Sequence, residues 1–365
     1  MWGSRYGRWR PTRPAQAGAP TRPAKVGRPT RPAKVGLAAA SLVLLLLASI
    51  TVAVTIGPAD ITATDVWAAI LHHVGLGSTP LSELRDGIVW ELRMPRVLTA
   101  AAVGAGLAVS GAVMQALTRN PLADPYLLGL SSGASLGAVT VLLLGAAVVL
   151  PLAAFVGALL ALGLTLALAS SLGRITPSRT VLAGVAVSAL ASALTSLVIF
   201  WWVTGDSYRE ILNWLLGSLA GARWPAVAIT FSAILVAGVP ILLSGRILDS
   251  FAFGDTSAAA LGVNVQGVRW SLLAVTALLT GAMVSVSGSI GFVGLILPHA
   301  VRLLVGPRHR VLLPLVALVG AIFLIWADTA ARALFDPREL PVGILTAIIG
   351  APVFAFLLAK RRSEA

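Results

Sequence analysis

GAVMQALTRNPLADPYLLGLSSGASLG, residues 111–137, is a polar, glycine-rich passage that lies between two long apolar stretches. It carries Gln115, Arg119, Asn120 and Asp124 among glycine and proline residues. At membrane depth, backbone that breaks a helix is tolerated only where it is buried in protein or lines a wet cavity. The passage therefore indicates a membrane protein with a path for a transported molecule.

The composition of the whole chain supports this interpretation. Of 365 residues, 57% are hydrophobic and 11% are charged, and the mean hydropathy is +0.91, whereas roughly a quarter of the residues in a soluble domain are charged. Stretches of about 20 apolar residues, the length that a spanning helix needs, recur after Gly36. We expect an all-α polytopic membrane protein with about ten transmembrane helices, at residues 37–57, 95–117, 127–147, 150–172, 179–203, 225–245, 268–289, 292–306, 311–331 and 340–359.

The net charge of +13 is concentrated in the N-terminal tail, residues 1–36, in which residues 12–36 repeat a nine-residue unit that begins TRPA. Nine of the 27 basic residues lie in the first 34 positions, and the first acid is Asp60. Proline and arginine at this density cannot build a core, so we expect a disordered basic tail and no nucleic-acid partner. With this tail in the cytoplasm, the spans place 20 basic residues inside and seven outside, in agreement with the positive-inside bias. Both termini, including residues 361–365, are thus expected in the cytoplasm of a bacterial cell, with the chain in its plasma membrane.

Three segments of the predicted ten-helix domain, residues 37–360, are long enough to have structure outside the spans. The outer segment 58–94 includes a short interfacial helix that Asp60 or Thr62 is expected to cap. Its neighbouring His72 and His73 point in different directions on a helix, so no metal site is expected. The outer segment 204–224 resembles a surface helix between belt tryptophans. The inner segment 244–268 contains a helix whose start Asp255 or Thr256 is expected to cap and which ends at Gly262.

Sequence motifs argue against an enzyme. The only lysines are Lys25, Lys34 and Lys360, none of them in a phosphate-binding glycine-rich loop, so ATP hydrolysis on this chain is excluded. The chain has no cysteine, which excludes disulfides, thiolate metal sites and a cysteine nucleophile. Asp328 is the one acid near the interior of a span, and Arg332, four residues later on the same helix face, is its predicted partner.

Three stretches, residues 92–138, 291–314 and 327–354, resemble the iron-chelate and vitamin B12 permease family of ABC importers. The resemblance runs from about residue 40 to residue 359 and leaves out the repeat tail. It implies a vitamin B12 permease-like fold of the type II ABC importers, with ten spans. It also implies partners: a second permease copy or a close homologue, two cytoplasmic ATPase subunits that hold ATP and Mg, and a solute-binding protein outside. No cofactor is expected on this chain.

The resemblance also assigns roles to individual residues. Arg93, Arg96 and Arg332 are expected to dock the binding protein, because arginine forms bidentate bonds to carboxylates; interfacial snorkelling or the Asp328–Arg332 pair are the alternatives. The expected cytoplasmic gate consists of Asn120 and Leu122, next to Pro121, together with Thr176 and Pro177, although Asn120 could simply cap a helix-ending turn. The expected contact with the ATPase lies in residues 247–266 and consists of Phe253, Gly254, Asp255, Ala259, Leu261 and Gly262.

Two functions remain open at this stage. The first is the permease subunit of an ATP-driven importer, working by alternating access, with a ferric siderophore as the expected substrate and cobalamin or haem as alternatives. The second is a secondary carrier coupled to protons or sodium. That class usually carries intramembrane acids, and Asp328 stands nearly alone, which favours the importer. The sequence leaves homodimer and heterodimer open.

Overall fold

The computed structural model describes residues 32–77, 81–146, 149–171, 176–203, 207–251, 254–335 and 338–362. The predicted tail therefore lies almost entirely outside the described residues, as does Phe253. The described elements are α1 (Pro32–Thr55), α2 (Ala63–His73), α3 (Glu83–Gly87), the π-helix η1 (Ile88–Arg93), α4 (Met94–Thr118), the 3₁₀ turn η2 (Pro125–Leu128), α5 (Leu130–Leu143), α6 (Leu150–Ser171), α7 (Pro177–Trp202), α8 (Ser207–Leu215), α9 (Trp224–Ala233), the π-helix η4 (Ile234–Gly238), α10 (Val239–Leu243), α11 (Gly245–Phe251), α12 (Asp255–Ala260), α13 (Val265–Ser287), α14 (Val293–Val305), α15 (His309–Ala333) and α16 (Val342–Arg362).

Apolar helices lie at all ten predicted positions. Seven helical stretches are long and apolar enough to cross a membrane, and three shorter apolar helices cover Leu130–Leu143, Val293–Val305 and Val342–Phe356. At about 1.5 Å per residue, the 13 residues of α14 reach only part of the way across a hydrocarbon core of about 30 Å. Both α5 and α14 directly follow a segment in which the α-helix is interrupted. These short helices therefore mark the places where the backbone leaves α-helical geometry.

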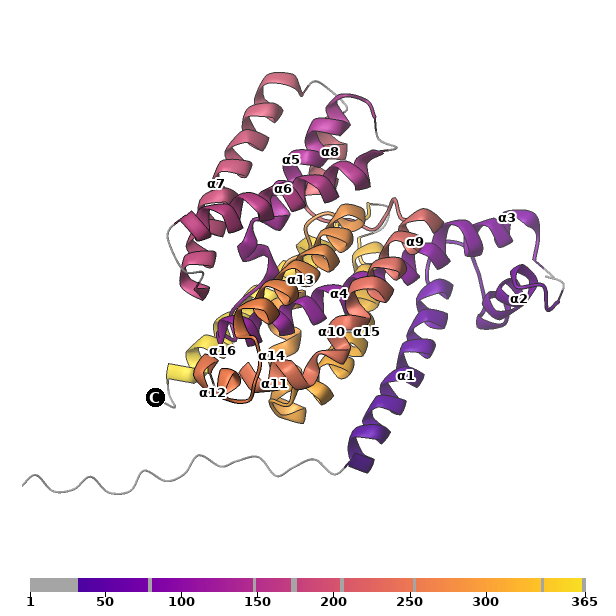
Figure 1. Ribbon diagram of the computed structural model, residues 1–365. Coiled ribbons are helices and arrows are strands. Elements are labelled where there is room, and N and C mark those ends of the chain that lie inside the picture. The colour runs from indigo at the N-terminus through magenta and orange to yellow at the C-terminus, as the bar shows by residue number, and fades with distance from the viewer. Residues whose placement is uncertain are drawn as a thin grey trace, which may run out of the picture.

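Both ends of the described chain lie on one side of the bundle. Figure 1 shows the start of α1 and the end of α16 at the end that carries α11 and α12. This arrangement is the one that an even number of spans produces. We call this end the inner face and the opposite end the outer face, following the orientation that the charge distribution predicts.

Helix α4 forms the centre of the bundle and is buried along almost its whole length. Two glycines allow its backbone to touch neighbouring helices, because a Cβ atom at Gly104 would overlap the carbonyl oxygen of Gly320 in α15, and one at Gly111 would overlap that of Gly294 in α14. Small residues at such crossings let helices approach closely in membranes. The close packing fixes both ends of α4, where the polar side chains lie.

Two π-helical turns alter the predicted span boundaries. The turn Ile88–Arg93 joins α3 to α4, so the second apolar helix starts at Glu83 and continues to Thr118. The turn Ile234–Gly238 lies within the sixth predicted span and joins α9 to α10, so that Trp224–Leu243 is one helical stretch. Such turns insert an extra residue into a helix and often occur at functional sites.

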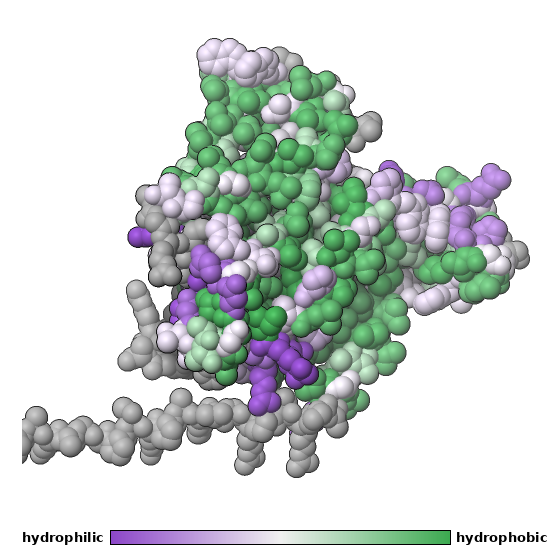
Figure 2. Space-filling view, viewed as in Figure 1, coloured by the Kyte–Doolittle hydropathy of each residue, from purple (hydrophilic) through white to green (hydrophobic). Residues whose placement is uncertain are grey.

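The surface of the bundle is apolar where lipid is expected. Leucine side chains on several helices are exposed, among them Leu44 in α1, Leu160 in α6 and Leu235 in η4. Figure 2 shows hydrophobic residues over most of this face, with hydrophilic residues gathered at the inner end and on the part that projects to the right. That projecting part consists of α2 and α3, which extend beyond the outer end of α1 (Figure 1).

Candidate functional site

Two segments that interrupt the spanning helices, one between α4 and α5 and one between α13 and α14, meet inside the bundle. Tyr126, in the passage between α4 and α5, donates its hydroxyl hydrogen to the carbonyl oxygen of Ile290 at 3.0 Å and accepts from the Ile290 amide at 3.2 Å. Ser131 donates to the hydroxyl of Ser289 at 2.8 Å. The segment between α13 and α14 is thereby held against the polar passage, and its Phe292 takes a left-handed backbone conformation with φ of 69°. The boundary between the seventh and eighth spans is therefore a real break, which the sequence marked only by glycine and serine.

A hollow of about 360 Å³ opens beside this contact. It is lined mainly by apolar groups, with polar atoms from three residues: Asp124, Tyr126 and Ser188. Asp124 accepts the Tyr126 amide at 2.8 Å and lies between the spanning segments, where burial raises the pKa of its carboxyl group to about 6. The hollow thus offers a path-like space with a single titratable carboxyl group in its lining.

A second polar contact joins α4 to α14 on the inner side of this break. The amide nitrogen of Gln115 donates to the carbonyl oxygen of Leu295 at 2.9 Å, and Arg302 donates to the amide oxygen of Gln115, also at 2.9 Å. This satisfies the carbonyl oxygen of Leu295 near the start of the short helix α14. The polar residues of the opening passage therefore hold the irregular backbone in place.

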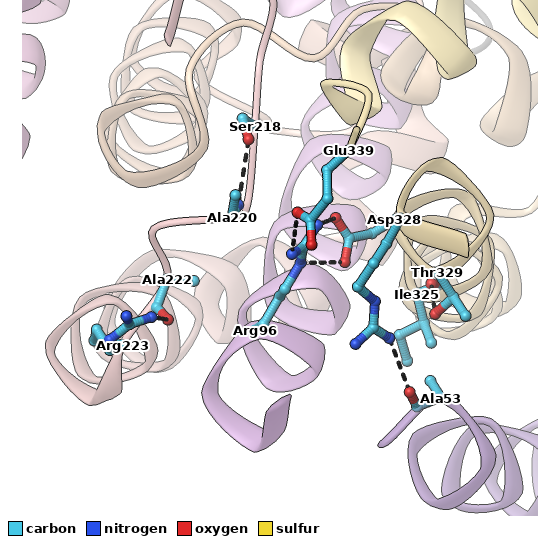
Figure 3. Close-up of polar contacts among 11 residues, drawn as sticks. Ala53, Arg96, Ser218, Ala220, Ala222, Arg223, Ile325, Asp328, Thr329 and Glu339 are labelled. Atoms are coloured by element: carbon cyan, nitrogen blue, oxygen red, sulfur yellow. Dashed lines mark hydrogen bonds and ion pairs between the residues drawn. The ribbon is translucent and has the colours of Figure 1, made fainter. Parts of the chain in front are cut away.

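At the outer face, Arg96 lies between two carboxylates (Figure 3). Its Nε and Nη2 donate to the two oxygens of Asp328 at 2.8 and 3.0 Å, and its Nη1 donates to Glu339 at 2.7 Å. The Asp328 side chain is 3% exposed, whereas the Glu339 side chain is 44% exposed. We call these three residues the outer triplet; it has one buried pair and one arm that faces solvent.

The predicted Asp328–Arg332 ion pair is wrong. Both oxygens of Asp328 accept from Arg96, while Arg332 extends toward α1 and its Nη2 donates to the carbonyl oxygen of Ala53 at 2.9 Å. The physical reason is that the fork of an arginine on a neighbouring helix matches a carboxylate in the bidentate geometry, which a partner on the same helix at i+4 does not provide here.

Arg93 holds the end of α1. Its Nη1 donates to the carbonyl oxygens of Val54 and Thr55 at 2.9 and 3.1 Å, and its Nη2 donates to that of Ala59 at 3.2 Å. Cations that bind the last carbonyls of a helix also interact favourably with its dipole. Arg93 and Arg96 are both buried, so docking through these arginines stays a prediction, and it requires a carboxylate to reach groups that already have internal partners.

At the inner face, the predicted gate residues form local turns. Arg119 ends α4 in a left-handed conformation with φ of 50°, and the side-chain oxygen of Asn120 accepts the Leu122 amide at 3.0 Å. Thr176 caps α7 by accepting the Arg179 amide at 3.4 Å. The side chain of Pro177, the first residue of α7, lies outside the described part.

The ends of α4 and α7 nevertheless come together. Thr118 and Thr180 line one narrow cavity of about 20 Å³, together with the buried Arg269 of α13. A role as gate stays a prediction for the residues at these two helix ends, since the structure shows their place and not their motion.

The segment predicted to contact the ATPase carries a second cluster of three charged residues, with the charges reversed relative to the outer triplet. Asp255, at the start of α12, accepts from Nη2 of Arg269 with both carboxylate oxygens, at 2.8 and 3.0 Å, and Nη2 of Arg119 lies 3.6 Å from Oδ1 of the same carboxylate. The Arg269 side chain is 7% exposed and the Arg119 side chain 50%. We call Arg119, Asp255 and Arg269 the inner triplet. It connects α12 to the end of α4 and to α13.

Other features of this segment refine the prediction. Asp255 does not cap α12, because Gly254, with φ of 96°, occupies the N-cap position and the carboxylate points to Arg269. Asp249 in α11 accepts the backbone amide of His309 at 2.6 Å, which ties α11 to the start of α15. Ala259 and Leu261 are exposed, and Gly262 ends the segment with φ of 82°. The segment thus combines fixed ties to spans with an exposed apolar side.

Comparisons with known proteins agree with this geometry. The model of the FecCD transport family matches residues 44–360. The cobalamin import system permease protein BtuC of Halobacterium salinarum is 41% identical over 355 residues, which cover 88% of this chain and 95% of that protein. The hemin transport system permease protein HmuU of Yersinia pestis is 40% identical, with 83% and 92% covered. The Fe(3+)-citrate import system permease protein YfmD of Bacillus subtilis is also 40% identical, with 76% and 82% covered.

A solved structure described as an inward-facing metal-chelate type ABC transporter superposes with a TM-score of 0.77 at 34% identity. The match covers 89% of this chain and 99% of that one. The family match and the fold match both extend over most of the chain. The protein therefore belongs to the FecCD transport family, as an ABC importer permease.

Proposed function

We propose that this chain forms the membrane path of an ATP-driven importer that takes up an iron chelate, with a ferric siderophore as substrate. Two permease copies, or this chain and a close homologue, enclose the path, and two separate ATPase subunits drive alternating access from the cytoplasm. A solute-binding protein delivers the substrate at the outer face.

The observation that carries this proposal is the inner triplet. The segment that contains α11 and α12 has an exposed apolar side at the inner face, and its Asp255 is bonded to Arg269 and faces Arg119 at the end of α4. A motion applied to this segment from outside the bundle therefore reaches α4 and α13 through charged contacts. A permease without its own nucleotide site needs such a connection.

A relative named for Fe(3+)-citrate import and a fold neighbour described as a metal-chelate type transporter support an iron chelate. Cobalamin is the second candidate, because the relative with 41% identity over 88% of this chain is named for cobalamin import. Haem is the third, on the same ground.

Uptake measured separately for each candidate substrate distinguishes the three. The chain is reconstituted in liposomes with its ATPase and binding protein, and labelled ferric siderophore, cobalamin or haemin is supplied outside with ATP inside. We expect ATP-dependent accumulation of the siderophore and little of the other two. Preferential uptake of cobalamin or haemin would replace the substrate and leave the importer intact. Uptake driven by a pH or sodium gradient without the ATPase would instead support the secondary carrier.

A further inference from the structure

The part of the chain that projects from the outer end of α1 has one side without a protein partner among the described residues. We call residues 63–77 and 81–87, which include α2 and α3, the outer arm. Trp67, Leu71 and Val74 are spaced at i, i+4 and i+7, so they form one stripe along α2. Their exposed fractions are 47%, 44% and 56%. On the opposite side of α2, Val66 and Ala69 are buried.

Contacts on the opposite side fix the direction of this stripe. Thr62 and Asp65 form a capping box, in which Asp65 accepts the Thr62 amide at 2.9 Å. The ring of His73 stacks on Trp90 with centroids 4.1 Å apart and planes 4° apart, and its Nε2 contacts Asp86 at 2.8 Å. The apolar stripe is therefore a defined surface of an anchored helix and not the side of a frayed one.

The arm lies at the level where the membrane ends. It follows α1 directly, and α1 is a spanning helix that ends at Thr55. Leu44, Leu47 and Val52 on α1 are exposed, so this helix presents apolar side chains to lipid up to its outer end. Figure 1 shows the arm extending sideways from that end, away from the bundle. The arm thus begins where the apolar, exposed surface of the spanning helix α1 ends.

The charges of the arm favour apolar contact over attraction to anionic headgroups. Its described charged residues are Asp65, Glu83, Asp86 and Arg85, which leave it acidic when the histidines are neutral. Tryptophan prefers the membrane–water interface because it has an apolar ring and a polar N–H group. Amphipathic helices in this position bury their apolar face about 5–10 Å into the boundary between headgroups and acyl chains.

We propose that the outer arm lies in the outer membrane interface, with the Trp67–Leu71–Val74 stripe in contact with acyl chains. The occupant of this surface is the lipid bilayer itself, and the contact does not depend on which substrate the protein carries. The arm thereby fixes the depth of the outer ends of α1 and α4 in the membrane.

Because the chain lacks cysteine, single cysteines label uniquely. Leu71→Cys and Val74→Cys place an environment-sensitive fluorophore on the stripe, and His72→Cys is the matched control, since it is exposed and adjacent to Leu71 but turned about 100° around the helix. The full chain is reconstituted in phosphatidylcholine vesicles. Quenching is measured with aqueous iodide and with lipids that carry a nitroxide near the top or deep in the acyl chain.

We expect the labels at positions 71 and 74 to be quenched by the shallow nitroxide and protected from iodide, and the label at position 72 to show the reverse. Replacing a fifth of the lipid with phosphatidylglycerol should leave this pattern unchanged. Equal iodide quenching at all three positions would overturn the proposal. So would protection of positions 71 and 74 from both quenchers, which would mean that protein covers the stripe, and so would equal lipid quenching at all three positions.

Discussion

At the outer face an arginine lies between two carboxylates, whereas at the inner face a carboxylate lies between two arginines. Each triplet has a buried arginine, Arg96 or Arg269, and an arm that reaches solvent, Glu339 or Arg119. The difference lies in the central pair. Arg96 and Asp328 are both buried, while Asp255 is 40% exposed opposite the buried Arg269.

The comparison teaches which contacts hold the fold and which can be exchanged. A buried ion pair does little for stability compared with an apolar pair, but removing one partner leaves a charge without compensation. A solvent-exposed charge pair costs little to form or to break. Each triplet therefore combines a fixed pair with an arm whose contact costs little to break. Substitutions in the four pairs test this distinction.

Asp328→Asn should cause the greatest loss. It removes the bidentate carboxylate of the buried Arg96 and leaves Glu339 as its anionic partner, so we expect a loss of about 3 kcal/mol in the free energy of unfolding, the lower end of the range for breaking a buried pair. Thermal unfolding of the detergent-solubilised protein measures the effect. Glu91→Gln, an exposed acid just before α4, is the control and should change little. Equal shifts in the two variants would contradict a structural role for the buried pair.

Arg269→Met should cost less, because the volume is kept and the stranded carboxylate of Asp255 still reaches water. We expect a loss of about 1.5–3 kcal/mol, the range for a hydrogen bond to a charged group. Arg246→Gln, an exposed position in α11, is the control in the same unfolding assay. A loss as large as that of Asp328→Asn would show that the two central pairs are equally buried in the working protein.

Glu339→Gln should leave stability within about 1 kcal/mol of the parent and should strengthen docking of the binding protein, because the Nη1 group of Arg96 loses its competing carboxylate. Titration of the binding protein onto the reconstituted permease measures this, with Glu210→Gln as control. If affinity stays the same in Glu339→Gln and also in Arg96→Gln, Arg96 does not dock the binding protein.

Arg119→Gln should have the smallest effect on stability. Its guanidinium is half exposed and lies 3.6 Å from Asp255, so about 0.2–1 kcal/mol is expected. Salt screens exposed charges over about 10 Å at 0.1 M ionic strength. The difference in the free energy of unfolding between Arg119→Gln and the parent should therefore vanish at 1 M salt. A difference that persists at 1 M salt would show that the Arg119–Asp255 contact is buried.

The helices and their order were predictable because a membrane requires long apolar stretches with internal hydrogen bonds. Local capping was also predictable, because a helix cap depends on residues that are close in the sequence. Thr62, one of two candidates, caps α2. The single sixth span was predicted and is the apolar stretch Trp224–Leu243, but the π-helical turn Ile234–Gly238 within it leaves no mark in an apolar sequence.

Contacts between distant parts of the chain could not be predicted. Arg96 and Asp328 are 232 positions apart, so the i+4 rule pointed to Arg332, the nearer candidate. Tyr126 contacts Ile290 over 164 positions, and the sequence gives no reason to single out Tyr126 from other aromatic residues. Glu339 lies in the stretch 327–354, to which the sequence assigned no outer ion pair, and only the fold shows that Arg96 is its partner.

The direct test of the inner triplet as the link from the ATPase to the path is the number of substrate molecules imported per ATP hydrolysed. It is measured in proteoliposomes for Asp255→Asn and for Glu339→Gln, with assembly of the ATPase checked by size-exclusion chromatography. We predict that Asp255→Asn assembles normally but imports fewer molecules per ATP, while Glu339→Gln keeps the parent ratio. A parent ratio in Asp255→Asn, or equal losses in both variants, would contradict this link.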